Sequence, residues 1–262
     1  MNVFVFDIET IPDVASGATL NRFEGLDDEA VATAMSHLRQ QKVGHDFLPL
    51  HLHRVVAISA VFRSRDRLKV WSLGDEDADE AEIIQRFFNG IEEFAPTLVS
   101  WNGSGFDLPV LHYRAMKHGI VASRYWDTGE SGGDFKWNNY ISRYHQRHLD
   151  LMDLLALYNP RAYAPLDEVA AMLGYPGKMG MSGAKVREAW QAGNIAGIRN
   201  YCETDVLNTY LVYLRFEVMR GRLNRDELAA EIARLRDWLM QEDKEHFNEF
   251  LTAWSDREAQ PD

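Results

Sequence analysis

Val3-Phe4-Val5-Phe6-Asp7-Ile8-Glu9-Thr10 is the stretch from which the fold can be argued. Its leading run of apolar residues, rich in Val and Phe, predicts a strand that is buried on both faces. Residues two apart on a strand share a face, so Asp7 and Glu9 should project together from the strand's end. Two neighbouring carboxylates repel each other strongly. A divalent cation between them would remove that repulsion, and the alternative is a strand that simply stops at a solvated acidic turn.

Composition indicates one large domain, or one domain with an extension. The chain has 262 residues, is 46% hydrophobic and contains a single cysteine, Cys202. One cysteine excludes an internal disulfide framework and a cysteine-based zinc site. The longest apolar runs are shorter than the ~20 residues that a membrane span needs. Met1 leads almost directly into the first strand, which leaves no room for a signal peptide. We therefore expect a cytoplasmic protein that does not contact a membrane.

The net charge of −12 argues against a surface that coats nucleic acid broadly. A local basic groove around an acidic site is compatible with that charge. The composition is therefore compatible with a nucleic-acid substrate.

Apolar periodicity predicts an α/β fold in which helices flank a mixed sheet. Residues 55–62 and 68–73 are typical of two strands joined by a polar turn, which makes an antiparallel hairpin. A short strand over residues 97–101 leads into a helix over residues 108–117 that Gly119 closes. The hairpin and the alternation of strand with helix together give the mixed sheet. Further helices are predicted at residues 29–41, 75–94, 149–157, 166–173, 184–191 and 195–219.

Two more stretches place acids where a metal site could assemble. Asp107 follows a glycine-containing loop directly after a predicted strand, and strand ends are where α/β sheets place their sites. Tyr201 and Asp205 lie four residues apart in a long helix and share a face. Acids from three elements and one phenol suit two-metal phosphodiester hydrolysis, in which oxygen ligands hold Mg²⁺ or Mn²⁺ ions ~3.5–4 Å apart. The alternatives are a helix N-cap for Asp107 and a packed aromatic for Tyr201.

These stretches together resemble the motifs of the DEDD superfamily of 3'–5' exonucleases, which have the ribonuclease H-like fold. The segment Phe6–Thr10 resembles the first motif, Asn102–Asp107 the second and Tyr201–Asp205 the third, in the same order. A tyrosine four residues before the last Asp, with Asn200 where the histidine branch has His, points to the tyrosine branch. The nearest likeness is to the proofreading exonuclease domain of family B DNA polymerases, in a stand-alone form. The 57 residues after the third motif are too few for the polymerase domains.

The resemblance implies a catalytic role for each of these acids. Asp7, Glu9 and Asp205 would bind the ion that activates water, Asp7 would bridge to a second ion, and Asp107 would hold that second ion through water. Tyr201 would orient the attacking water. Its ordinary pKa near ~10 makes the hydroxyl a hydrogen-bonding group at pH 7 and not a general base. The two cations would be Mg²⁺ or Mn²⁺.

The implied activity is a metal-dependent 3'–5' exonuclease that hydrolyses single-stranded DNA, or DNA 3' ends, to nucleoside monophosphates. DNA is favoured over RNA as the partner, and the sequence indicates no protein partner. One alternative is a 3'–5' exoribonuclease, because no residue reports on the 2'-hydroxyl. The other is a non-catalytic nucleic-acid-binding module on the same fold, although the chain keeps every acid of the motifs.

Substrate contacts are expected from the second motif and from two basic positions outside the motifs. Asn102 and Phe106 belong to the second motif, and we assign both to substrate binding. Lys178 stands in a glycine-rich loop between two predicted helices and could reach a phosphate. Arg143 and Arg147 lie in a segment that contains no acid and interleaves aromatic with basic residues. That pattern suits a single strand, because rings stack on bases while cations meet phosphates. A surface loop or hairpin is the alternative for this segment, residues 136–148.

The remaining expectations concern the second half of the chain. His148, Asp150 and Asp153 have the spacing of metal ligands, but we expect them to be solvated positions on a helix. The exonuclease domain is expected to span residues 1–220, followed by a helical C-terminal extension over residues 221–262. The apolar stripe of that extension should pack on the same domain, with a dimer contact as the alternative, and consists of Leu228, Ile232, Leu235 and Leu239.

Overall fold

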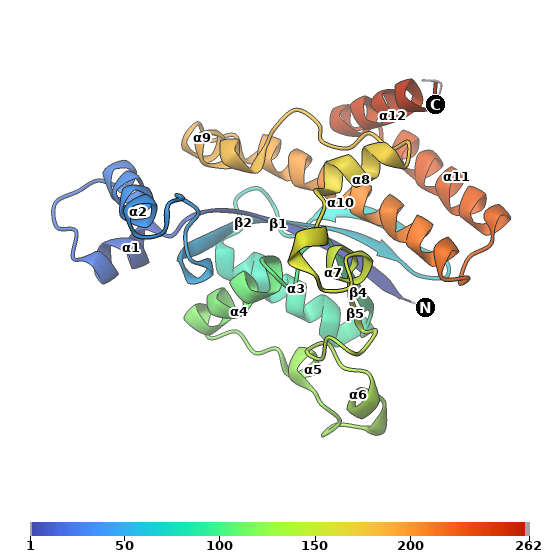
Figure 1. The fold of residues 1–262 in the computed structure, drawn as a ribbon, viewed down its shortest axis with the longest axis horizontal. Helices are drawn as coiled ribbons and strands as arrows, with labels where there is room; N and C mark the ends of the chain where they lie inside the picture. The colour runs from blue at the N-terminus through green and yellow to red at the C-terminus, as the bar shows by residue number, and fades with distance from the viewer. Residues whose placement is uncertain (1, 260–262) are drawn as a thin grey trace.

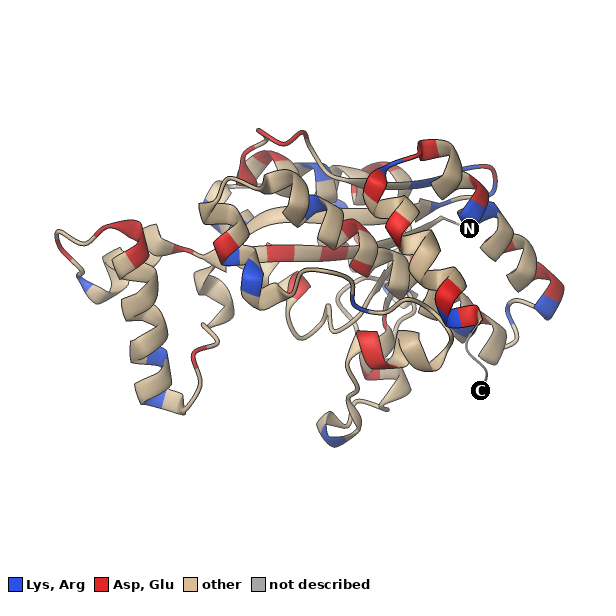
Figure 2. Ribbon diagram, turned by 90° about the horizontal axis from the view of Figure 1, so that it is seen from above, with Lys and Arg blue, Asp and Glu red and all other residues tan. Residues whose placement is uncertain are grey.

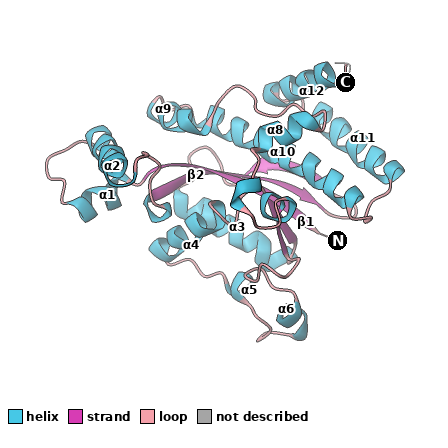
Figure 3. Cartoon of the chain, viewed as in Figure 1, coloured by secondary structure: helices cyan, strands magenta, loops and turns pink. Residues whose placement is uncertain are grey.

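The computed structural model describes residues 2–259 (Figure 1). A five-stranded mixed sheet lies at its centre, in the order β3-β2-β1-β4-β5 (Figure 3). The three strands β3, β2 and β1 pair antiparallel, whereas β1, β4 and β5 run parallel. The predicted ribonuclease H-like mixed sheet with flanking helices is confirmed. The strands are β1 (Val3–Pro12), β2 (His53–Arg63), β3 (Leu68–Ser72), β4 (Thr97–Ser100) and β5 (His148–Asp150).

Strand β1 continues past its two acids, so the expectation that they project from the strand's end is wrong. Asp7 pairs with Ser59 of β2 and Glu9 pairs with Ala57, and the register shifts only after Glu9. The strand continues because β2 is long enough to supply backbone partners on both sides of the polar residues. The two acids therefore lie within the central strand of the sheet.

Alternation along β1 directs its side chains to two separate cores. Val3 and Val5 are buried with residues of α10 (Ile195–Met219), whereas Phe4 and Phe6 are buried with residues of α3 (Glu80–Phe94) and α4 (Asp107–His118). Because side chains alternate, Asp7 and Glu9 belong to the face that α10 covers. Helix α10 was predicted with these bounds, and the asparagine before it accepts a hydrogen bond from Gly197 N to begin the helix.

The other helical elements surround the sheet or project from it (Figure 1). Helices α1 (Val14–Asn21) and α2 (Asp28–Val43) form an arm beyond one end of the sheet, shown in blue. The arm was predicted only in part, because α1 carries no clear apolar stripe. Smaller elements are η1 (Leu50–Leu52), α5 (Ser123–Trp126), α6 (Gly133–Trp137), α7 (Leu151–Leu155), η2 (Pro160–Ala162), α8 (Leu166–Met172), η3 (Gly183–Lys185) and α9 (Val186–Gln191).

A buried ion network anchors the arm to the body of the molecule. Arg114 of α4 forms ion pairs with Asp13, which caps α1, and with Glu80 of α3. Lys117 adds a second cation on Asp13, with Nζ 2.7 Å from Oδ2. Paired charges of this kind tolerate burial, whereas removing one partner would leave an uncompensated charge. The network therefore fixes the base of the arm against α4.

The predicted helix over residues 149–157 is wrong in its first part. Residues 148–150 form strand β5, in which Leu149 pairs with Val99 of β4, and helix α7 begins only at Leu151. The Asp150 carboxylate accepts a hydrogen bond from Met152 N and so caps α7. The apolar spacing of this short run fits a helix as well as a strand, and only the free edge of β4 selects the strand.

Helices α11 (Arg225–Glu242) and α12 (Glu245–Glu258) pack onto α10 on the same side of the sheet (Figure 1). Their buried side chains belong to the cluster that contains Val3 and Val5, and include Leu235, Leu239, Phe247, Phe250 and Trp254. The boundary between an exonuclease domain of residues 1–220 and an extension of residues 221–262 stays a prediction. Within residues 2–259, no helix is long and apolar enough to span a membrane.

Candidate metal centre

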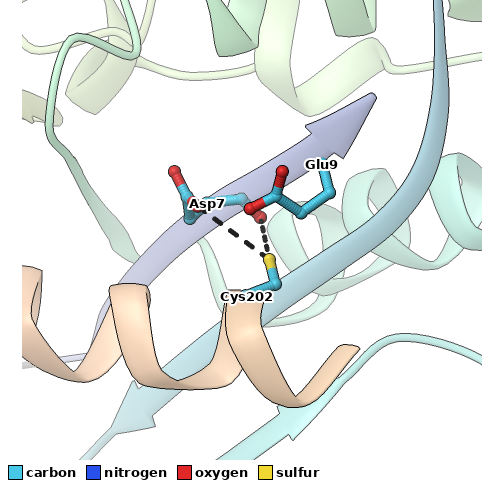
Figure 4. A group of neighbouring side chains, drawn as sticks. All are labelled: Asp7, Glu9 and Cys202. Carbon is cyan, nitrogen blue, oxygen red and sulfur yellow. Dashed lines mark hydrogen bonds between the residues drawn. The ribbon is translucent and has the colours of Figure 1, made fainter. Parts of the chain in front are cut away.

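Asp7 and Glu9 point from β1 toward helix α10, where Cys202 lies beside them (Figure 4). One ligand atom from each of these three residues lies within 4.8 Å of the other two. The Cys202 thiol donates to the Asp7 backbone carbonyl, with 3.4 Å between sulfur and oxygen. Cys202 was not predicted as a neighbour of the site. The available signal was its position directly after Tyr201 in the third motif.

Asp107 reaches the same acids from helix α4. Its side chain is buried, and its Oδ1 accepts a hydrogen bond from Ile8 N at 3.1 Å. The donor belongs to the residue between Asp7 and Glu9, so the Asp107 carboxylate lies against the centre of that pair. Phe106 occupies the N-cap position of α4, and Asp107 is the first residue of the helix. The N-cap alternative for Asp107 is therefore wrong.

Tyr201 and Asp205 approach from α10, the third element. Both line a pocket of about 160 Å³, together with Lys178 and Asn208. Their spacing of one helical turn places both side chains on the face that meets the pocket. The pocket is completed by Leu166, Asp167 and Gly177.

Asp7 and Glu9 are affected electrostatically by the other acids. Burial raises the pKa of Asp7 well above its ordinary value, and repulsion from Asp107, Glu9 and Asp205 raises it further. Burial likewise raises the pKa of Glu9, and repulsion from Asp205 and Asp107 adds to the effect. Each carboxylate therefore makes ionisation of its neighbours harder, as expected for like charges in a site of low polarity.

The pKa values of the other two acids, Asp107 and Asp205, are also raised. Burial raises the pKa of Asp107 to about 7, against hydrogen bonds from its own N–H and from that of Ile8. Burial raises the pKa of Asp205 to about 6, against a hydrogen bond from Tyr201 and attraction by Lys178. Carboxylate oxygens are the ligands that Mg²⁺ and Mn²⁺ prefer. A divalent cation would neutralise the repulsion that the protein fold creates here, so these residues fit such an ion.

Lys178 is held close to the acids by its neighbours. The loop residue Gly177 donates its N–H to Asn208 Oδ1 at 3.1 Å and accepts from Asn208 Nδ2 at 2.7 Å. These two bonds tie the loop to α10 and bring Lys178 to the pocket, where its charge lowers the pKa of Glu9 against the effect of burial. Asn208 was not predicted as a site residue, although it follows Asp205 by three residues and so shares its helix face.

The second-motif loop is organised by Asp150. Its carboxylate accepts hydrogen bonds from Asn102 N at 3.0 Å and from Ser104 N at 2.8 Å. Asp150 is 5% exposed, so the expectation that it is solvated is wrong. His148 is equally engaged, because its Nε2 lies 2.8 Å from Ser100 Oγ. These contacts fix the loop that leads into Phe106 and Asp107.

The basic segment of residues 136–148 has two differently placed arginines. Arg143 lines a second pocket, of about 280 Å³, which Ser104 of the second-motif loop also lines. Arg147 instead donates to the carbonyls of Asn138 and Ala95, at 2.7 and 3.1 Å. Substrate binding by either arginine stays a prediction. Figure 2 shows acidic and basic residues scattered over the whole fold, and the net charge of the chain is −12.

The comparison with protein families covers most of the chain. The family described as predicted 3'-5' exonucleases related to the exonuclease domain of PolB matches residues 45–254. This range contains Asp107, Tyr201 and Asp205, whereas Asp7 and Glu9 precede it.

Curated relatives include two DNA polymerases. The DNA polymerase of Archaeoglobus fulgidus is 27% identical over 150 residues, which are 56% of this chain and 19% of that protein. The DNA polymerase of Pyrococcus glycovorans is 28% identical over 156 residues, which are 56% of this chain and 20% of that protein. The chain thus spans about a fifth of the length of these relatives.

A solved structure also resembles the fold. The family B DNA polymerase from Pyrobaculum calidifontis superposes with a TM-score of 0.46 at 24% sequence identity, over 80% of this chain and 24% of that one. The match to the family model extends over far more than half of the sequence, and it therefore shows which family the chain belongs to. This protein belongs to the family of predicted 3'-5' exonucleases related to the exonuclease domain of PolB.

Proposed function

We propose that this protein is a metal-dependent 3'–5' exonuclease that hydrolyses single-stranded DNA, or DNA 3' ends, to nucleoside monophosphates. The observation that carries the proposal concerns Asp7, Glu9, Asp107 and Asp205: burial raises the pKa of all four, and repulsion from the other acids raises it further for Asp7 and Glu9. An acidic cluster of this kind is costly unless cations compensate it. The family supports the same activity.

The proposed chemistry assigns each residue a task. Asp7, Glu9 and Asp205 would hold one Mg²⁺ or Mn²⁺ ion, and Asp7 with Asp107 would hold a second. Such a pair of ions supplies a hydroxide near neutral pH and stabilises the attacking and leaving oxygens. Tyr201 would orient the attacking water through its hydroxyl, which is protonated at neutral pH because a tyrosine's ordinary pKa is ~10 and burial raises the pKa of Tyr201 further.

Substrate contacts would come from residues around the cluster. Lys178 lines the pocket of Tyr201 and Asp205 and offers a cation for a phosphate. Arg143 would meet the strand at the second pocket, which Ser104 of the second-motif loop also lines. Asn102 and Phe106 would contact the strand from that loop. DNA is the favoured substrate because the curated relatives are DNA polymerases, and the proposed location is the cytoplasm.

The test is degradation of matched single strands of DNA and RNA that carry a label at the 5' end. With Mg²⁺ or Mn²⁺, the wild type should shorten DNA stepwise from the 3' end and release nucleoside monophosphates. Asp7→Ala and Asp205→Ala should abolish hydrolysis, because each removes an oxygen ligand. Glu242→Ala is the matched control, since this acid lies exposed on α11, away from the cluster.

The outcomes separate the alternatives. Degradation of RNA but not DNA would replace the proposal with an exoribonuclease. No hydrolysis of either strand, with binding retained, would indicate a non-catalytic nucleic-acid-binding module. Near-wild-type turnover by Asp7→Ala or Asp205→Ala would exclude these acids as essential ligands.

A further inference from the structure

A row of polar side chains crosses the sheet beneath helix α10. Asp7 of β1 pairs with Ser59 of β2, and Ser59 pairs with Ser72 of β3. Residues that are paired across antiparallel strands lie on the same face of a sheet, so both serines share the face on which Asp7 points toward α10. The two serines are buried, and their hydroxyl oxygens are 2.8 Å apart. The row therefore leads from the metal centre to the edge strand of the sheet.

Glu203 of α10 meets this row at Ser72. Its Oε1 accepts hydrogen bonds from Ser72 N at 2.8 Å and from Ser72 Oγ at 2.9 Å. Its Oε2 lies 2.8 Å from His246 Nε2 and 3.5 Å from Lys244 Nζ. A carboxylate only accepts hydrogen bonds, so the imidazole of His246 donates. One buried acid thus joins α10 to β3 and to α12.

The same turn of α10 carries residues of the metal centre. Glu203 lies between Tyr201 and Asp205 in the sequence but occupies another face, because residues two apart do not face each other on a helix. The adjacent Cys202 donates its thiol to the Asp7 carbonyl, with 3.4 Å between sulfur and oxygen (Figure 4). This turn is thus bonded to β1 through Cys202 and to β3 through Glu203.

Arg199 holds the preceding turn of α10 against the end of β3. Its Nη2 donates to the carbonyls of Ser72 and Gly74, at 3.2 and 2.7 Å. Apolar packing of a helix on a sheet is non-directional, whereas a buried polar network whose members are all bonded favours one arrangement. The bonds of Arg199 and Glu203 therefore determine how α10 lies on the sheet.

We propose that Glu203, held by Ser72 and His246, is a positioning residue of the metal centre. Its bonds set where the other face of α10, with Tyr201 and Asp205, meets the acids of β1. The inference rests on the proposed function and makes α12 a support of the metal centre as well as a part of the core. Groups that orient metal ligands typically change metal affinity or activity by about 10- to 100-fold when they are removed.

The test measures Mn²⁺ binding directly and without substrate, from the loss of the paramagnetic resonance signal of free Mn²⁺ as protein is added. Glu203→Ala removes the links to β3 and α12 together and should weaken Mn²⁺ binding by about 10-fold or more. Glu203→Gln keeps an oxygen that can accept from Ser72 N, and should recover part of the affinity. Single-turnover hydrolysis should fall in parallel with the affinity.

Variants of His246 separate positioning from charge. His246→Ala leaves the Glu203 charge in place but removes a bond that holds it, so positioning predicts weaker Mn²⁺ binding, whereas a purely electrostatic role predicts none. His246→Gln restores an N–H donor and should bind Mn²⁺ as the wild type does. This pair also decides the question if Glu203→Ala does not fold.

Glu231→Ala is the matched control. Glu231 of α11 is also a mostly buried acid that bonds α10 and the sheet, because it accepts from Tyr210 of α10 at 3.2 Å and from Arg63 of β2 at 2.6 Å. Its removal should lower the unfolding temperature and leave Mn²⁺ affinity unchanged. Thermal unfolding of every variant gives the stability against which the affinities are compared.

The inference is overturned if His246→Ala binds Mn²⁺ as tightly as the wild type, or if Glu231→Ala loses as much affinity as His246→Ala, since affinity would then follow stability alone. If the wild type binds Mn²⁺ more tightly than Asp7→Ala while the Glu203 and His246 variants match the wild type, only the positioning role is wrong. If the wild type and Asp7→Ala bind Mn²⁺ equally, the proposed metal centre fails and the positioning role fails with it.

Discussion

At the scale of single residues, the role of the Tyr201 hydroxyl can be tested separately from metal binding by the acids. This hydroxyl is protonated at neutral pH, since an ordinary tyrosine has a pKa of ~10, and burial with repulsion from Asp205 and Glu9 raises the pKa of Tyr201 further. Tyr201→Phe removes only the hydroxyl, so metal affinity and the fold should persist. The catalytic step should slow by ~10²–10³, the scale seen when one preorganised hydrogen bond is lost. Single-turnover hydrolysis beside a metal titration measures both quantities.

A matched control lies on the same helix. Tyr213→Phe removes a buried hydroxyl that does not line the pocket, and should leave hydrolysis unchanged. A fully active Tyr201→Phe variant would refute the positioning role. A variant that no longer binds metal would instead place Tyr201 among the groups that hold the ion.

Asp107 makes the stability of the metal-free protein depend on pH. Its pKa is about 7 in the folded state and about 3.9 in an unfolded chain. The folded state therefore holds the Asp107 proton more tightly than the unfolded chain does. The stability that protonated Asp107 contributes is fully present below pH ~4 and is lost as the pH rises through ~7. Asp107→Asn keeps an oxygen for Ile8 N but does not ionise. Without metal it should match the wild type near pH 4 and be more stable at pH 7.5, by up to ~4 kcal/mol.

Urea unfolding with a chelator present, at several values between pH 4 and 7.5, measures this difference. Glu242→Gln serves as the control, because that side chain is exposed on α11. Added Mg²⁺ or Mn²⁺ should reverse the order at pH 7.5, since only the wild type gains the full binding free energy. If the difference in the free energy of unfolding between Asp107→Asn and wild type stays constant with pH, the proposed role of Asp107 ionisation is wrong.

At the scale of elements, the short strand β5 matters more than its length suggests. It extends the sheet beyond β4 and ends at Asp150, whose carboxylate accepts hydrogen bonds from Asn102 N and Ser104 N. The same carboxylate caps α7. One buried acid thus fixes both the second-motif loop and the next helix. The bonds hold the loop so that α4 begins where Asp107 can meet the N–H of Ile8.

At the scale of the whole molecule, helices α11 and α12 complete the core behind the metal centre. The side chains of Phe247, Phe250 and Trp254 are at most 1% exposed. Each burial contributes roughly 1.5–3 kcal/mol, and whole domains are stable by only about 5–15 kcal/mol. A polar link reinforces this packing, because Glu203 of α10 lies 2.8 Å from His246 of α12.

We therefore expect a fragment of residues 1–220 to be unfolded or aggregated and inactive. The comparison is with a full-length variant, Glu249→Ala, which changes an exposed position of α12. Circular dichroism and thermal unfolding of both proteins give the readout. A fragment that unfolds cooperatively at the wild-type temperature would show that α11 and α12 are a separable extension.

Much of this architecture could be predicted because it is encoded in local spacing. The hairpin of β2 and β3 and the bounds of α10 follow from alternation, periodicity and capping, and the structure confirms them. The order of the motifs predicted the family, which the comparison confirms. Strand β5 could not be found in the same way, because a three-residue strand exists only where a neighbouring edge accepts it.

The sequence alone therefore predicted which acids could form the site, since chain neighbours decide which face of a strand or helix a side chain occupies. Only the tertiary structure decided their surroundings. Cys202 lies beside Asp7, Asp150 supports the second-motif loop, and Phe47 joins Phe106, across separations that no local pattern reports. The physical reason is that burial and repulsion depend on which segments meet in space. The raised pKa values of the acids arise only where the sheet, α4 and α10 exclude water from one place.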